Sequence, residues 1–225
     1  MRVLQIDPVD LPPDPLVAPG GWGSLAEVIR DDRPLAEDAA SLERFHAHLM
    51  ATGAEPAREL WQRLGPMGPL LDLGGGTGAY TKAYLAEFPH ESATLADKPE
   101  VLRLVRVPHA TLLPVDLLNM SPPAGQGVVL LANVLHLFGP RQVAHVVQLA
   151  QLALRPGGTM VVKDLRSDTA EGVLFALNMA LFTEEGDVHP AEFIEESFRS
   201  AGLVNPRRIE LESSPNSLVL AASKP

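Results

Sequence analysis

The sequence predicts an α/β fold, in which a seven-stranded, mostly parallel sheet carries helices on both faces and ends in an antiparallel hairpin. From residue 70 onward, short apolar runs bounded by Gly, Pro or Asp alternate with stretches of helical character, as in parallel strands joined by helices. The last two apolar runs are separated only by a turn. Hydrophobic residues make up 46% of the 225 residues, enough for one compact domain with a sizeable core.

The first 69 residues divide into an arm and a helical N-terminal extension. Residues 1–20 contain five prolines, which fix φ and remove backbone donors, so we expect an extended arm. In the extension, residues 21–69, a capping box beginning at Ser24 precedes a short helical pattern. The Ala, Leu and Glu content of residues 35–64 predicts a longer helical stretch, with an interruption at its internal glycine and proline.

Residues 70–225 form the predicted α/β domain. Apolar runs and helical spacing place strands at 70–73, 93–96, 111–115, 128–131 and 159–163, and helices at 77–88, 99–106, 141–154 and 190–201. The hairpin is expected from residues 208–211 and 217–221, which flank a turn-forming Ser-Ser-Pro-Asn segment. These elements supply the seven strands of the predicted sheet.

Composition argues against several classes of protein. The net charge is −10 and neither part of the chain is basic, which argues against a nucleic-acid partner. The chain has no cysteine, which excludes disulfides, thiolate metal sites and a cysteine nucleophile, and we expect no metal. Prolines and glycines interrupt the long uncharged run 117–140, so we expect no membrane partner, and the N-terminus lacks a signal peptide pattern. A cytoplasmic protein is the expectation.

A glycine-rich loop follows the first predicted strand. Gly74, Gly76 and Gly78 have G-x-G-x-G spacing two residues after Asp72, which differs from the G-x-G-x-x-G pattern of nicotinamide-dependent oxidoreductases. Glycines let a ligand approach the backbone, and the helix that follows offers free N–H groups. Asp97 ends the next strand, where a carboxylate can accept hydrogen bonds from two ribose hydroxyls. The alternative is that the glycines only allow tight packing of strand and helix.

This loop and its acid resemble the first motif of the class I S-adenosylmethionine-dependent methyltransferases. The resemblance implies a Rossmann-like fold, S-adenosylmethionine as cofactor and S-adenosylhomocysteine as its product. Asp116, after the third strand, matches the acid that faces the adenine amine in that family, although a strand-end cap explains it equally well. The expected cofactor-binding residues are Asp72, Gly74, Gly76, Gly78, Asp97, Asp116, Leu117 and Asn133.

The loop after the fourth strand resembles a narrower family. Asn133-Val134-Leu135-His136 is similar to the N-V-L-H segment of O-methyltransferases of the plant caffeate and bacterial polyketide type. The resemblance implies that His136 is the general base, which removes the proton of a hydroxyl as its oxygen attacks the methyl group. It also implies that Asp164 and Asp187, which match family acids, orient the imidazole. The expected acceptor is a hydroxyl on an aromatic or polyketide-like small molecule.

Some residues depart from the family pattern. Leu137 stands where an acid usually follows the histidine, and Val188-His189 replaces an R-T pair. We expect this chain to lack the winged-helix domain that usually precedes this segment and builds the family's homodimer, which leaves a homodimer of this chain open. Three alternatives also stay open: His136 as a loop-stabilising residue, N- or C-methylation of a small molecule, and a non-catalytic module that binds S-adenosylmethionine.

Overall fold

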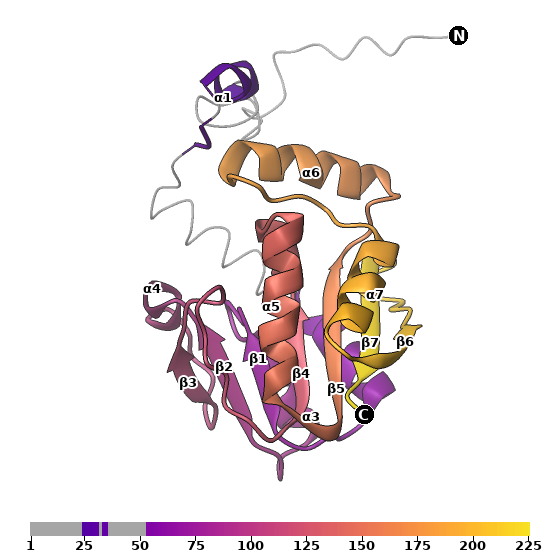
Figure 1. The fold of residues 1–225 in the computed structure, drawn as a ribbon. Helices are drawn as coiled ribbons and strands as arrows, with labels where there is room; N and C mark the ends of the chain where they lie inside the picture. The colour runs from indigo at the N-terminus through magenta and orange to yellow at the C-terminus, as the bar shows by residue number, and fades with distance from the viewer. Residues whose placement is uncertain (1–23, 32, 36–52) are drawn as a thin grey trace, which may run out of the picture.

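The computed structural model describes residues 24–31, 33–35 and 53–225 and confirms the α/β prediction (Figure 1). One seven-stranded sheet has the order β3-β2-β1-β4-β5-β7-β6, in which β7 runs antiparallel to both of its neighbours and the other pairs are parallel. The strands are β1 (Leu70–Leu73), β2 (Ala93–Asp97), β3 (Thr111–Pro114), β4 (Gln126–Ala132), β5 (Leu154–Leu165), β6 (Val204–Arg208) and β7 (Ser217–Ser223). The proline-rich arm and residues 36–52 of the long predicted helix lie outside the described residues.

The helices that lie wholly within the described ranges are α1 (Leu25–Asp31), α3 (Ala79–Glu87), α4 (Pro99–Leu102), α5 (Pro140–Ala153), α6 (Ala170–Phe182) and α7 (Ala191–Ser200), with a 3₁₀ turn at Leu135–Leu137. Residues 53–64 are also helical, so the glycine and proline expected to interrupt a helix lie in its first described turn. None of the helices in the described ranges is long and apolar enough to cross a bilayer.

Two apolar clusters cover the two faces of the sheet, because neighbouring strand residues point to opposite sides. On one face, Leu71 and Leu73 pack with α5 and α7, which lie in front of the sheet in Figure 1. On the other, Leu70 packs with α3 and with the helical residues 53–64. Trp61 fixes this second layer, since its indole donates to the carbonyl oxygen of Tyr80 at 2.8 Å. The glycine loop and the strand ends are therefore held between two buried layers.

Several predicted boundaries were wrong. The strand expected at 159–163 extends over Leu154–Leu165, and the helix expected at 99–106 ends at Leu102. The first hairpin strand begins and ends earlier than predicted, at Val204–Arg208. The sequence prediction also missed α6, which lies across the end of the sheet where β5 stops (Figure 1).

The N-terminus of α6 is built by Thr169 and Gly172. The Thr169 hydroxyl accepts a hydrogen bond from the Gly172 amide at 3.0 Å, which satisfies one of the helix's orphan donors. A Cβ at Gly172 would overlap the carbonyl oxygen of Arg166, so only glycine fits this tight entry into the helix. The turn brings α6 back over the strand ends.

Candidate functional site

The glycine loop has two kinds of glycine. Gly74, Gly76 and Gly78 all have positive φ, at 69°, 52° and 77°, a region that costs other residues energy. A Cβ at Gly74 would lie 2.6 Å from a Val134 methyl, and one at Gly78 would overlap Val107. At Gly76 the nearest atom would be 3.9 Å away. Two of the glycines therefore serve packing, while Gly76 keeps a backbone surface open to a ligand.

Asp72 supports the loop from beneath. Its side chain is buried, and one carboxylate oxygen accepts from the Thr81 hydroxyl at 2.6 Å. The other oxygen is buried without a hydrogen-bond partner among the described residues. Burial, with a smaller contribution from the charge of Asp97, raises the pKa of Asp72 to about 7 although the Thr81 hydrogen bonds lower it. Asp72 is therefore placed to shape the loop and to respond to charge near it.

Asp97 joins the end of β2 to the loop. Its carboxylate accepts hydrogen bonds from the Gly76 amide at 2.8 Å and from the Lys98 amide at 2.7 Å. The side chain is half-buried at the carboxyl end of the strand. These amides fix the carboxylate beside the open glycine, which is the arrangement expected for a ribose-binding acid.

Asp116 and Leu117 follow β3. Asp116 is exposed and accepts from the Leu118 amide at 3.0 Å and the Asn119 side chain at 2.7 Å. These hydrogen bonds lower the pKa of Asp116. Leu117 lies against the glycine loop, 3.4 Å from the Cβ position of Gly74. Leu117 therefore lies at the glycine loop. Asp116 makes the contacts of a strand-end cap, the alternative to an adenine contact.

His136 and Asp164 form a buried pair. The Nδ1 atom of His136 lies 2.7 Å from Oδ1 of Asp164, and the His136 amide donates to the other oxygen at 3.2 Å. Burial raises the pKa of Asp164, but the charge and hydrogen bond of His136, with the Leu165 amide and Lys163, outweigh it and hold that pKa below its usual range. The ring of Phe175 packs edge-on against the imidazole, with centroids 4.8 Å apart. The pair therefore holds the imidazole in one orientation.

Asp187 is placed differently from Asp164. It is exposed, and its carboxylate accepts from the Val188 amide at 2.7 Å. The preceding residue, Gly186, lies so close that a Cβ there would be 2.5 Å from the carbonyl oxygen of His136. His189, at the family's R-T position, contacts the Phe138 carbonyl through Nε2 at 2.9 Å. The segment thus passes the backbone of His136, but within the described residues no hydrogen bond joins Asp187 to the imidazole.

Lys163 and Phe175 also belong to this region, and neither is among the expected site residues. Phe175 contacts the imidazole. Lys163 donates to the Asn133 side chain at 2.9 Å from a buried position. Its signal was a lysine directly after the apolar run Met160–Val162, where a charged residue at the end of a central strand is unusual.

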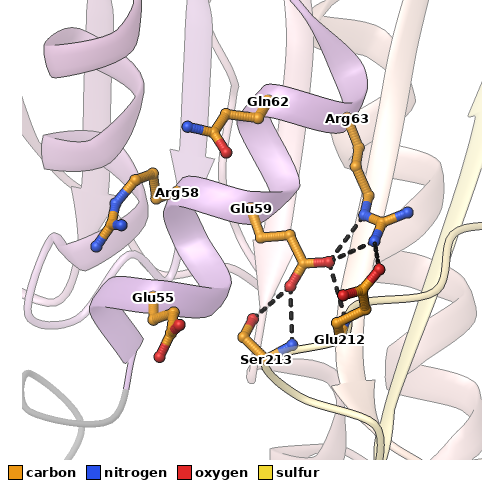
Figure 2. A pocket seen from close by; sticks show the side chains of 7 residues that line it. All are labelled: Glu55, Arg58, Glu59, Gln62, Arg63, Glu212 and Ser213. Atoms are coloured by element: carbon orange, nitrogen blue, oxygen red, sulfur yellow. Dashed lines mark hydrogen bonds and ion pairs between the residues drawn. The ribbon is translucent and has the colours of Figure 1, made fainter.

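A separate surface cavity lies between the helical residues 53–64 and the segment before β7. Figure 2 shows this cavity of about 450 Å³, lined by Glu55, Arg58, Glu59, Gln62, Arg63, Glu212 and Ser213. Glu59 accepts hydrogen bonds from both backbone amides and the serine hydroxyl of residues 212–213. These contacts attach the helix to the segment, and none of the lining residues belongs to the predicted site.

Comparison with known proteins assigns the chain to a family. Residues 52–204 match the family model of the O-methyltransferase domain. A 3-hydroxy-5-methyl-1-naphthoate 3-O-methyltransferase from Streptomyces sahachiroi is 26% identical over 229 residues, which cover 91% of this chain and 66% of that relative. The chain thus spans just under two thirds of the relative's length.

Two solved structures share the fold. An O-methyltransferase family protein from Burkholderia thailandensis aligns with a TM-score of 0.78 and 24% identity, over 90% of this chain and 68% of that one. Human N-acetylserotonin methyltransferase, solved in complex with S-adenosylmethionine, aligns with a TM-score of 0.69 and 22% identity, over 90% and 66% of the two chains. Because the family model matches more than half of its residues, the chain belongs to the family of O-methyltransferase domains.

Proposed function

We propose that the protein binds S-adenosylmethionine and methylates a hydroxyl group of an aromatic or polyketide-like small molecule, with His136 as general base. The buried His136–Asp164 pair, with its 2.7 Å contact, carries this proposal. The relative from Streptomyces sahachiroi, a hydroxynaphthoate O-methyltransferase by name, supports the acceptor class. The net charge of −10 favours a small-molecule acceptor over a nucleic acid.

The residues of the glycine loop fit S-adenosylmethionine. Gly76 leaves its backbone open to a ligand, and Asp97 stands beside it with a carboxylate that suits two ribose hydroxyls. Leu117 and Asn133 would complete the site from the ends of β3 and β4. When bound, S-adenosylmethionine supplies the electrophilic methyl group.

His136 would remove the proton of the acceptor hydroxyl. Because Nδ1 faces the Asp164 carboxylate, we assign the resting proton to Nδ1, which leaves the Nε2 lone pair for the hydroxyl proton. The imidazolium that forms is stabilised by the same carboxylate, as in the hydrolase triad. Phe175 covers one edge of the ring and limits its access to water. Asp187 would be a second positioning acid, because the segment that carries it passes the backbone carbonyl of His136.

Substitution of the base tests the proposal. His136→Ala and His136→Gln should lower hydroxyl methylation by about two to four decades while binding of S-adenosylhomocysteine, followed by calorimetry, is retained. Unchanged turnover in both variants would refute the base and favour methyl transfer to nitrogen or carbon. Binding of the nucleoside without turnover of any acceptor would instead indicate a non-catalytic module.

The cellular setting is also a proposal. We infer a cytoplasmic protein, the setting that the cysteine-free sequence favours. A homodimer is proposed by analogy with the family. Light scattering on the purified chain distinguishes it from a monomer.

A further inference from the structure

Lys163 presents a buried positive charge at the carboxyl end of β5. Its side chain is 8% exposed, and among lysines and arginines in the described ranges it alone is buried. Burial lowers the pKa of Lys163, while the charges of Asp164 and Glu171 raise it. A buried ammonium is costly unless its donors find acceptors, so its surroundings indicate what it binds.

Asn133 accepts one hydrogen bond from this ammonium. The Nζ atom of Lys163 lies 2.9 Å from the side-chain oxygen of Asn133. The backbone N–H of Asn133 also donates to the backbone carbonyl oxygen of Lys163 at 2.7 Å. An ammonium carries three N–H donors, and within the described part of the chain this amide oxygen is the acceptor of one of them. Because its oxygen is turned to the lysine, Asn133 keeps its own NH₂ group for another acceptor. The half-buried Asn133 and the buried Lys163 thus form a pair of donors.

The pair lies at the carboxyl ends of β4 and β5, the two strands that follow β1 in the sheet order. The register pairs Asp72 with Leu130 and Ala132 with Lys163, so Lys163 shares a sheet face with Asp72 and lies two residues nearer the carboxyl edge. Asn133 stands three residues before His136 and holds a left-handed φ of 55°. A ligand group that reached both donors would therefore lie at the carboxyl edge that also carries the glycine loop, on the face of the sheet opposite to Asp164.

We propose that Lys163 and Asn133 together bind a carboxylate at the ends of β4 and β5. Asp72, Asp97 and Asp164 near this edge are acids, whereas the buried ammonium of Lys163 and the NH₂ group of Asn133 supply the donors that an anionic group requires. The proposal rests on the proposed function, which offers two sources: the methionyl carboxylate of S-adenosylmethionine, or an acid group on the acceptor. A carboxylate here would take the remaining lysine donors as charge-assisted hydrogen bonds.

Matched ligand pairs distinguish the two sources by calorimetry on the full chain. One pair is S-adenosylhomocysteine and its decarboxylated analogue; the other is 3-hydroxy-1-naphthoate and 2-naphthol, measured with and without the nucleoside. The wild type should prefer the carboxylated member of one pair by about tenfold to hundredfold. Lys163→Met should abolish that preference, Lys163→Arg should keep part of it, and Lys82→Met, at an exposed lysine on α3, should leave it unchanged.

Each outcome has one meaning. Loss of preference in the nucleoside pair assigns the carboxylate to the cofactor, and loss only in the naphthalene pair assigns it to the acceptor. A wild type without either preference, or a Lys163→Met variant that keeps both, would overturn the proposal and leave the lysine as a support for Asn133. If Lys163→Met does not fold, the wild type and Lys163→Arg still decide. A wild type that binds neither nucleoside refutes the proposed function, while the naphthalene pair without nucleoside still tests the lysine.

Discussion

Replacing Asp164 by asparagine removes the charge that would stabilise the imidazolium without removing the side-chain oxygen near it. The carboxylate and the imidazole are both buried, and their contact is 2.7 Å, so their centres of charge lie about 4 Å apart. At an effective dielectric constant of about 20, unit charges at that separation attract by about 4 kcal/mol. Loss of this whole attraction would lower the rate of methyl transfer by roughly three decades, which is the upper bound. Because proton transfer is partial in the transition state, we expect the rate to fall by about two to three decades.

Single-turnover methylation is the assay, because it isolates the chemical step. Wild type, Asp164→Asn and the control Asp168→Asn would be mixed with S-adenosylmethionine and 3-hydroxy-1-naphthoate, and the methylated product measured by mass spectrometry. Asp168 is an exposed acid that pairs with Arg166 at 2.8 Å, so its variant controls for the loss of a negative charge. Nitrogen NMR of the His136 ring gives a second readout, since an asparagine NH₂ can donate to Nδ1 and move the resting proton to Nε2.

The two readouts together can refute the reasoning. If Asp164→Asn keeps its single-turnover rate within about threefold of the wild type, the carboxylate does not stabilise a charge that develops on the base. If the rate falls but the proton stays on Nδ1, the loss comes from the electrostatic effect alone. A fall of similar size in Asp168→Asn would show that the assay reports net charge.

Three further perturbations follow from the geometry. Burial raises the pKa of Asp72 from its ordinary value of 3.8 to about 7, so ionisation of this carboxyl destabilises the folded state increasingly as the pH rises from 3.8 to about 7. Asp72→Asn should therefore raise the melting temperature more near about pH 8 than near about pH 5. An equal effect at the two pH values would contradict a buried carboxyl. Gly76→Ala should lower stability by only about 1 kcal/mol but weaken S-adenosylhomocysteine binding, whereas Gly78→Ala should lower stability more because its methyl group overlaps Val107. Thermal melts measure the stability and calorimetry the binding. A larger loss of stability in Gly76→Ala than in Gly78→Ala would contradict a packing role for Gly78 and an open backbone at Gly76. Desolvation raises the pKa of Glu59, but the hydrogen bonds from Ser213, Glu212 and Arg63 lower it more, to about 2. The ionised Glu59 therefore stabilises the fold fully above its ordinary pKa of 4.5, and this stabilisation is lost as the pH falls toward about 2. The melting temperatures of Glu59→Gln and the wild type should differ near neutral pH and converge in acid.

The parallel strands and the helices between them were predictable because burial on both faces leaves short apolar runs between turn residues. The run Leu70–Leu73 is buried throughout, and its predicted bounds are those of β1. By contrast, α6 was missed because its residues are apolar on nearly every side, so no polar face marks a helical period. Its signal was local: Thr169 accepting from Gly172 is an N-cap that the sequence analysis did not use.

The candidate site was predictable where the chemistry is local. The glycine spacing and the acid that ends β2 named residues that the structure joins through the Gly76–Asp97 hydrogen bond. Contacts between segments far apart in the chain were harder. The pairing of His136 with Asp164 required a family resemblance, and the contact of Lys163 with Asn133 depends on the register of two strands, which local patterns do not specify.

Strand β5 carries Lys163 and Asp164 side by side in the chain, and the pleat sends them to opposite faces of the sheet. Inserting one residue upstream in the strand would place the ammonium against the imidazole, and deleting one would place the carboxylate beside Asn133. Seven residue pairs with β7, from Thr159 with Ser223 to Leu165 with Ser217, oppose such a slip. Pairing with β7 therefore fixes which face of the sheet Lys163 and Asp164 occupy. Over evolutionary time β5 should accept changes of residue type far more readily than changes of length.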